Sequence, residues 1–256
     1  KTFNGNQLGV LLAEFLLADR QKRGELDPRQ FLVTTLVTTR MANQIAQSYG
    51  VRCFSNNLVG FKWICDVIDR QGPDDFLFGF EESHGYLVGQ YCRDKDGAVA
   101  CMLMSQLAAK VKAEGISLHQ YLDQLYQKYG YFVENLVTIQ MEGSDGMKRM
   151  SALMNKFRTA MPEHLGDLSV VQRRDYLEGL TVTSSGVEER LDGPTYNLVF
   201  LDTETTGNYV AARPSGTEPK VKFYLFAHVP PDELGDLAVA KREMADRIQG
   251  FERTLQ

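Results

Sequence analysis

Residues 76–85 read FLFGFEESHG, an apolar run of five residues followed at once by two acidic residues, a serine and a histidine. A short apolar run bounded by polar residues predicts a fully buried strand over 76–80. In open α/β sheets, ligands bind beyond the carboxyl ends of the strands. The sequence therefore predicts a buried sheet with a polar binding loop, residues 81–85, at its edge.

Helices and strands alternate on both sides of this run, as far as Gly130. The expected caps of three of the helices are Asn6, Asp96 and Ser117. Apolar spacing and β-branched runs predict helices over 9–23, 41–49, 61–69, 98–113 and 117–129, and strands over 31–39 and 51–55. This alternation indicates βαβ units and a largely parallel sheet, hence an α/β domain over residues 1–130.

The pattern changes after Gly130, where strands gather between helices. The predicted strands cover 132–141, 168–173, 197–202, 209–213 and 220–228, and the predicted helices 145–159 and 232–253. Strands clustered between two helices indicate a second, α+β domain over residues 131–256.

Composition narrows the class of protein. A net charge of -5 over 256 residues argues against a general nucleic-acid or membrane-surface partner. The longest apolar stretch, residues 8–18, contains Glu14 and is too short to span a bilayer. The four cysteines, at positions 53, 65, 92 and 101, form no CxxC pair, so we expect reduced, mostly packed thiols in a cytoplasmic protein.

The loop over 81–85 suits a polyol ligand. Ionised carboxylates such as Glu81 and Glu82 accept hydrogen bonds from sugar hydroxyls, and Ser83 and His84 add further polar groups. The alternative is a solvated turn with an accidental cluster. Apolar residues on both sides of the loop argue against that alternative.

A second polar loop, ARPSGTEPK over 212–220, lies between two predicted strands. Arg213 offers a planar fork that matches phosphate, Ser215 and Thr217 offer hydroxyls, and Lys220 or Lys222 offers a point charge. Two prolines stiffen the loop. The alternative is an ordinary hairpin with a glycine turn.

Two further lysines are weaker candidates. Lys95, in the turn before Asp96, is a candidate charge clamp or proton shuttle, and a capped, charged turn is the alternative. Lys62 opens a helix whose N-terminus could hold an anion. His119, His164 and His228 show no catalytic or metal spacing, and no metal site is expected in this chain.

Three motifs resemble, in this order along the chain, those of the α-D-phosphohexomutase superfamily, and of its phosphoglucomutase/phosphomannomutase group in particular. They are EESHG over 81–85, KDG over 95–97 and RPSGTEPK over 213–220. Members of that family have four domains. The resemblance implies that residues 1–130 are the third, a mixed-sheet α/β domain, and residues 131–256 the fourth, an α+β domain similar to the TATA-binding-protein fold. The family's phosphoserine loop and magnesium loop do not occur in this sequence, so the N-terminal domains are expected to be missing.

The resemblance also implies roles for individual residues. Sugar hydroxyls would be contacted by Glu81 and Ser83, in a loop shaped by Glu82, His84 and Gly85. Lys95 would be the proton donor or acceptor, with Lys62 in support, although Val59 departs from the family's usual threonine. The phosphate would be held by Arg213, Ser215, Gly216, Thr217 and Lys222.

The implied activity interconverts hexose 1-phosphate and hexose 6-phosphate through a phosphoserine and a hexose 1,6-bisphosphate, with Mg²⁺ in the full-length enzyme. The paired glutamates favour glucose phosphate. Mannose phosphate is the close alternative, a pentose phosphate stays open, and glucosamine phosphate is disfavoured. The present chain alone is expected to be inactive. Its rivals are a non-catalytic sugar-phosphate binding module and a structural protein without a ligand.

Overall fold

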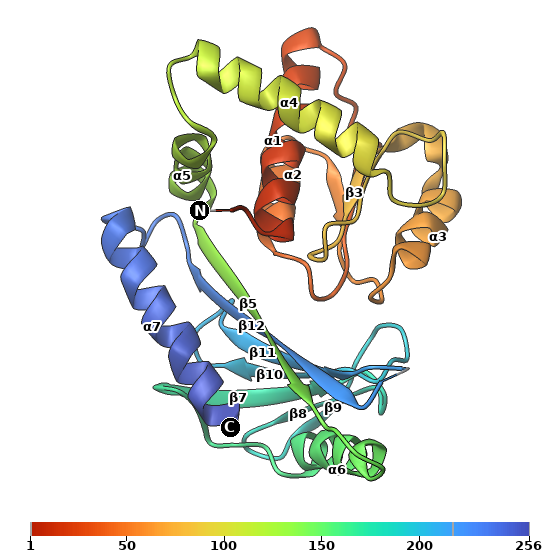
Figure 1. The fold of residues 1–256 in the computed structure, drawn as a ribbon, viewed down its shortest axis with the longest axis vertical. Coiled ribbons are helices and arrows are strands. Elements are labelled where there is room, and N and C mark those ends of the chain that lie inside the picture. The colour runs from red at the N-terminus through yellow and green to blue at the C-terminus, as the bar shows by residue number, and fades with distance from the viewer. Residues whose placement is uncertain (1, 217, 256) are drawn as a thin grey trace. The chain divides into compact units, whose positions relative to one another are not determined.

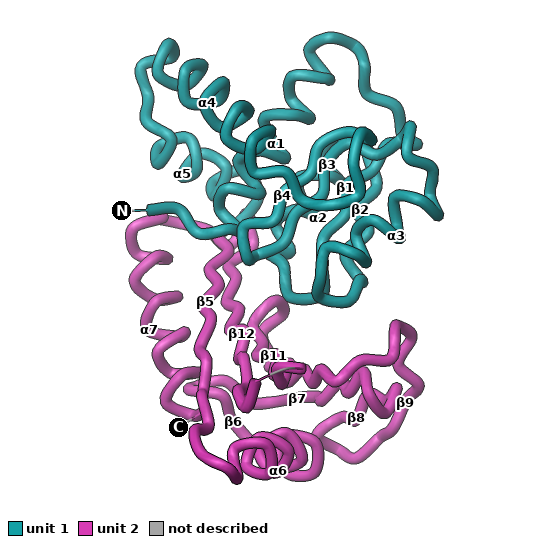
Figure 2. The backbone as a smooth tube through the Cα atoms, turned by 45° about the vertical axis from the view of Figure 1, so that its right-hand side comes forward, with its two compact units in different colours: residues 1–130 teal, residues 131–256 magenta. Residues whose placement is uncertain are grey.

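The computed structural model describes residues 2–216 and 218–255. The chain forms two compact units, unit 1 up to Gly130 and unit 2 from Tyr131 (Figure 2).

Unit 1 contains a sheet with strand order β2-β1-β3-β4. These strands are Arg52–Phe54 (β2), Phe31–Val33 (β1), Phe76–Phe80 (β3) and Tyr86–Val88 (β4). β1 runs parallel to β2 and to β3, whereas β4 returns antiparallel to β3. The predicted strand at 76–80 is confirmed at both ends, and all five of its residues are buried. The mixed α/β sheet that the resemblance implies is therefore confirmed, whereas strand β4 itself was not predicted.

Helices α1 to α5 and a short 3-10 turn, Pro73–Asp75, complete unit 1 (Figure 1). The helices are Gly5–Arg23 (α1), Met41–Ser48 (α2), Phe61–Gln71 (α3), Gly97–Ala113 (α4) and Leu118–Tyr129 (α5). Asp96 and Ser117 cap α4 and α5 as predicted. The predicted cap Asn6 is wrong, because Asn4 and Gln7 form the capping box of α1 and Asn6 accepts from the Thr39 amide instead.

The predicted strand over 31–39 is also wrong beyond Val33. The Thr35 and Thr38 hydroxyls lie 2.8 Å apart, and the Thr38 hydroxyl also accepts from the Thr35 amide. Threonine hydroxyls that bond to nearby backbone offer the chain an alternative to a sheet ladder. The buried threonines therefore form a turn where β-branching alone predicts a strand.

A buried carboxylate links α1 to α2 and α5. Glu14 is 5% exposed and accepts hydrogen bonds from the hydroxyls of Tyr49, at 2.9 Å, and Tyr129, at 2.7 Å. The Lys128 ammonium lies 3.1 Å from the same carboxylate. These bonds tie α1 to the end of α2 and to α5.

Unit 2 is built on an antiparallel sheet with strand order β5-β12-β11-β10-β7-β8-β9, and β6 pairs with β7. The strands are Tyr131–Gln140 (β5), His164–Leu165 (β6), Leu168–Asp175 (β7), Leu180–Thr183 (β8), Glu188–Arg190 (β9), Val199–Thr203 (β10), Tyr209–Pro214 (β11) and Lys220–Val229 (β12). Helices α6, Gly146–Thr159, and α7, Leu237–Leu255, pack against β5, β11 and β12.

The sequence analysis predicted an α+β architecture for this part, and the structure confirms it. It missed β6, β8 and β9 and placed the start of α7 too early. The similarity to the TATA-binding-protein fold stays a prediction. In the described part of the chain, no helix is both long enough and apolar enough to cross a bilayer.

Candidate functional site

The loop over residues 81–85 is a tight connection between β3 and β4. Its ends are held together because the Glu81 amide donates to the Gly85 carbonyl at 2.9 Å. Glu81 is only 6% exposed, whereas Ser83 and His84 are exposed. His84 has a backbone φ of 67°, which residues other than glycine rarely adopt. Buried and exposed acceptors thus lie within five residues, in a loop held by its own backbone.

Gly85 leaves room for two of the predicted site residues. A Cβ at this position would lie 2.8 Å from Glu81 Oε2, 3.4 Å from Lys95 Cδ and 3.1 Å from Phe61 Cδ2. The Glu81 carboxylate and the Lys95 stem therefore both border the space beside Gly85. Phe61 is the first residue of α3, so that helix also borders the loop.

The first turn of α1 supports the loop from the other side. The Tyr86 hydroxyl donates to the Gly5 carbonyl at 3.0 Å and lies 3.4 Å from His84 Nδ1. A Cβ on Gly5 would lie 2.0 Å from the Glu82 carbonyl oxygen and 2.9 Å from the His84 amide nitrogen. The sequence analysis missed these supporting roles of Gly5 and Tyr86, because only folding brings residues 5 and 82 together.

Lys95 is half-exposed and pairs with Asp94, with 2.9 Å between Nζ and Oδ1. This hydrogen bond raises the pKa of Lys95, and the charges of Asp94 and Glu81 raise it further. The same hydrogen bond lowers the pKa of Asp94. Lys95 is therefore a cation at neutral pH, suited to clamping an anion or donating a proton and unsuited to accepting one.

Lys62 is exposed on the first turn of α3, and its ammonium lies 5.0 Å from the centre of the Trp63 ring. Gly60 precedes that helix with a φ of 125° and gives it no side-chain cap. The start of α3 therefore lies beside the loop over 81–85, because Phe61 packs against Gly85. Lys62 instead extends over the Trp63 ring.

The second predicted loop, residues 215–219, joins β11 to β12 in unit 2. Arg213 on β11 stands directly opposite Lys222 on β12, and Lys222 stands opposite Thr138 on β5. Side chains directly opposite in an antiparallel pair share one face of the sheet. Two cationic groups therefore meet on one face, next to a threonine hydroxyl that the sequence analysis did not single out.

The Nε–H of Arg213 is buried and has no hydrogen-bond partner among the described residues. Its guanidinium lies 6.0 Å from the centre of the Tyr196 ring. A buried donor without a partner costs free energy in the unliganded protein. This arginine is therefore a ready donor for a ligand.

The loop itself is braced at its base. The Ser215 amide donates to the Lys220 carbonyl at 2.8 Å, and the Glu218 amide donates to the Ser215 hydroxyl at 3.3 Å. Lys220 forms an ion pair with Glu218. The strand register places Lys222, and not Lys220, opposite Arg213. Gly216 is exposed and has open space around it, and Thr217 lies outside the described residues.

Both units resemble known phosphohexomutases. Residues 4–129 match the family described as "Phosphoglucomutase/phosphomannomutase, alpha/beta/alpha domain III". A phosphoglucomutase from Staphylococcus saprophyticus is 32% identical over 231 residues, which cover 89% of this chain and 41% of the relative. The chain belongs to the α-D-phosphohexomutase superfamily.

Solved structures agree on the fold. A putative phosphomannomutase from Thermus thermophilus aligns with a TM-score of 0.54 at 20% identity, over 95% of this chain and 41% of that one. The phosphoglucomutase parafusin from Paramecium aligns with a TM-score of 0.58 at 15% identity, over 98% of this chain and 42% of that one. This phosphohexomutase chain therefore spans about two fifths of the length of the relatives it matches.

The described residues of this phosphohexomutase chain contain no group of three or more histidine, cysteine, aspartate or glutamate side chains that could hold a metal ion.

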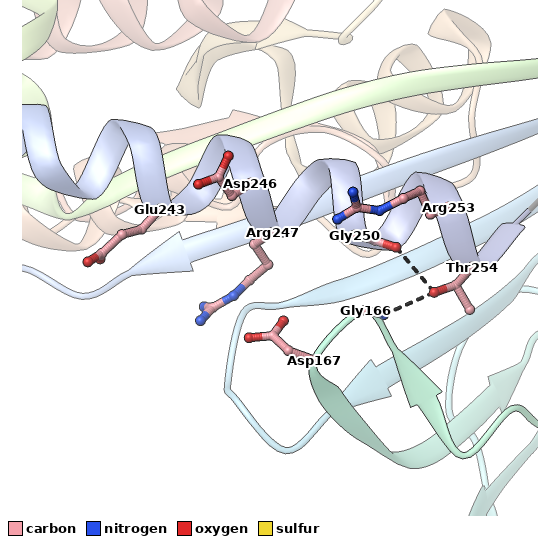
Figure 3. A pocket seen from close by; sticks show the side chains of 8 residues that line it. All are labelled: Gly166, Asp167, Glu243, Asp246, Arg247, Gly250, Arg253 and Thr254. Carbon is pink, nitrogen blue, oxygen red and sulfur yellow. Dashed lines mark hydrogen bonds between the residues drawn. The ribbon is translucent and has the colours of Figure 1, made fainter.

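A cavity of about 630 Å³ lies between α7 and the turn that joins β6 to β7 (Figure 3). It is lined by Gly166, Asp167, Glu243, Asp246, Arg247, Gly250, Arg253 and Thr254. The turn is held against the helix because the Gly166 amide donates to the Thr254 hydroxyl at 3.0 Å. None of the predicted site residues lines this cavity, which mixes charges of both signs.

Proposed function

We propose that this chain is the C-terminal part of a phosphoglucomutase/phosphomannomutase, with units 1 and 2 as its third and fourth domains. The complete enzyme would interconvert hexose 1-phosphate and hexose 6-phosphate in the cytoplasm, through a phosphoserine and a hexose 1,6-bisphosphate. Glucose phosphate is the preferred substrate. The curated phosphoglucomutases that match most of this chain support the proposal.

The observation that carries the proposal is the cationic pair on β11 and β12. Arg213 and Lys222 are directly opposite each other, and the Arg213 Nε–H is buried without a partner among the described residues. Like charges directly opposite destabilise a sheet unless an anion lies between them. A phosphate would accept from the arginine fork and neutralise the pair.

The loop over 81–85 supplies the hydroxyl contacts. The buried Glu81 carboxylate lies against Gly85, close to the Lys95 stem, and the exposed Ser83 hydroxyl can both donate and accept. Carboxylate and hydroxyl groups together match a polyol. The sugar bisphosphate would have to reorient between the two phosphoryl transfers. Glu81 and Ser83 would contact hydroxyls that the sugar presents similarly in both orientations.

In the proposed reaction, a free hydroxyl of the sugar attacks the phosphoryl group on a serine outside this chain. The new O–P bond forms as the serine O–P bond breaks, and the proton that the sugar hydroxyl gives up is balanced by the proton that the serine oxygen gains, so that no net proton is consumed. Lys95, which its neighbours keep protonated, can clamp the moving phosphoryl group or donate that proton. Binding of the remote phosphate by Arg213 would position the sugar for attack.

Calorimetric titration of the chain with glucose 1-phosphate tests the binding part of this proposal. We expect Arg213→Ala to lower the affinity at least about tenfold, because a charge-assisted bond to phosphate contributes more than about 1.4 kcal/mol. Arg190→Ala is the matched control, since Arg190 is exposed on β9 of the same unit. Unchanged affinity in Arg213→Ala, with unchanged folding, would overturn the phosphate assignment.

A non-catalytic sugar-phosphate binding module is the second candidate. It requires nothing beyond the two polar loops of this chain, which carry Glu81 and Arg213. A coupled assay with the chain alone should show no turnover under either proposal, and turnover would contradict both. Restoration of turnover when the coding sequence upstream of Lys1 is included separates the mutase from the module.

A further inference from the structure

The outward face of α4 is apolar. The first thirteen residues of that helix, GAVACMLMSQLAA over 97–109, include no charged residue. Its inward side packs against α1, β4 and α5. The exposed side chains over 98–109 are Ala98, Cys101, Met102, Ser105, Gln106 and Ala109, and the charged Lys110 and Lys112 follow in the last turn. A largely apolar, exposed helix side of this kind often marks an interaction surface.

Tyr91 extends this surface at the start of the helix. Its side chain is 61% exposed, and its hydroxyl donates to Asp96 Oδ2 at 2.5 Å, which raises the pKa of Tyr91 to about 12. Because Asp96 caps α4, the tyrosine ring is fixed beside the first turn. Met102, one turn further on, is 52% exposed. Exposed aromatic and methionine side chains of this kind are enriched at the centres of protein interfaces.

Other helices of the chain have outward faces of a different kind. On α7, for example, Arg242, Glu243 and Asp246 are exposed. Figure 1 shows α4 lying in front of α1 and β3, on the outside of unit 1. The apolar outward side is therefore a property of α4 and not of the helices in general.

We propose that Tyr91 and the exposed side chains at 98, 101, 102, 105 and 109, together the α4 face, bind the part of the phosphohexomutase polypeptide that precedes domain III. This inference rests on the proposed function. The chain spans about two fifths of its curated relatives, so such a partner has the size to cover a helix. The occupant is thus the upstream segment of the same protein.

The position of α4 relative to the loop over 81–85, the sugar loop of the proposed function, favours this occupant. The helix begins at Gly97, two residues after Lys95, and the Lys95 stem borders Gly85. The proposed reaction needs a phosphoserine, carried by the upstream segment, to reach the sugar at this loop. A segment that presents its serine there must pack beside the loop, and the α4 face is the apolar surface that lies next to it.

Cys101 provides a probe within the α4 face. Cys65 is buried, Cys53 and Cys92 are only partly exposed, and burial raises the pKa of Cys53 to about 12. The exposed Cys101 should therefore react fastest with a maleimide. We would label the present chain and the protein extended by its upstream coding sequence, and measure each cysteine by peptide mass spectrometry. Ala245→Cys, at an exposed position on α7, is the control in both proteins.

We expect Cys101 to react at least about tenfold more slowly in the extended protein, with the cysteine at position 245 unchanged, as burial of a thiol at an interface requires. Equal rates for Cys101 in the two proteins would overturn the inference. Slow labelling already in the present chain would also overturn it, since residues 131–256 or a second copy would then cover the face. A coding sequence without an upstream domain would do the same.

Met102→Glu gives a second test in the extended protein. The change should restore fast labelling of Cys101, because a buried, unpaired carboxylate opposes docking, whereas Lys112→Glu at the far end of the helix should not. Failure of Met102→Glu to restore labelling would contradict the inference. Protection of Cys101 without mutase turnover would refute the proposed function alone, and turnover with Cys101 freely labelled would refute the α4 face alone.

Discussion

Replacement of Gly85 by alanine tests whether the loop over 81–85 binds a sugar through the Glu81 carboxylate that lies beside that glycine. The added Cβ would lie 2.8 Å from Glu81 Oε2 and 3.4 Å from Lys95 Cδ. Gly85 is not among the glycines with positive φ, so alanine can adopt its backbone conformation without strain. The whole effect should therefore come from the added methyl group.

The closest clash is with the carboxylate end of Glu81, which can rotate away, whereas the buried Phe61 ring, 3.1 Å from the added Cβ, must shift by only a few tenths of an ångström. Overpacking of this size costs about 1 to 3 kcal/mol. If the cost falls on the bound state, affinity for glucose 1-phosphate drops roughly 5-fold to 150-fold. We expect that loss with little change in the unfolding midpoint.

Calorimetric titration with glucose 1-phosphate measures the affinity, and urea denaturation measures the stability. Gly97→Ala is the matched control, because a Cβ at the start of α4 would meet nothing within 4 Å. Full affinity in Gly85→Ala would show that Glu81 does not contact the sugar from its observed position. Loss of folding in Gly85→Ala would show that the glycine serves packing and not binding.

Three more outcomes are expected. Gly5→Ala should lower the free energy of unfolding by about 3 kcal/mol or more, because its Cβ would lie 2.0 Å from the backbone oxygen of Glu82, and urea denaturation at the wild-type stability would contradict this contact. Glu14→Leu should cost about 3 kcal/mol or more, since Tyr49 and Tyr129 lose a charged acceptor, and an additive double change with Tyr129→Phe would contradict their coupling. Burial raises the pKa of Tyr49 and of Tyr129, whereas the unfolded chain loses these protons near pH 10, so the free energy of unfolding should fall above about pH 10. Urea titrations from about pH 8 to about pH 11 measure that decline, which Tyr129→Phe should reduce.

The local parts of the fold could be predicted from sequence, and the parts that depend on distant partners could not. The strand at 76–80 is apolar throughout, and Ser117 caps α5 as its position predicts. In contrast, β9, Glu188–Arg190, is fully exposed, and only its pairing with β8 makes it a strand. The prediction of a strand beyond Val33 failed for a different reason. The threonine hydroxyls bond to each other and to nearby backbone, although β-branched residues favour an extended chain.

The candidate site divides in the same way. The resemblance indicated Glu81, Lys95 and Arg213, and the structure brings the first two to the borders of one space beside Gly85. The motif contains no information on the support from Gly5, because that contact depends on how α1 packs against the loop. The position of Lys222 opposite Arg213 depends on the register of β11 and β12, and the alternation of apolar residues alone does not determine which residues pair.

The two loops differ in what holds them before a ligand arrives. The loop over 81–85 is fixed by its own backbone hydrogen bond, by the first turn of α1 and by Phe61, so its acceptors are already in place. On β11 and β12, two cations share one face, and the arginine has a buried donor without a partner among the described residues. The first arrangement favours selection among sugars, because a rigid loop rejects hydroxyls that do not fit. The second favours affinity for any phosphate, because an anion relieves both the repulsion and the unpaired donor. The proposed mutase would need both properties, because the bisphosphate must reorient while the protein still holds the sugar and one phosphate.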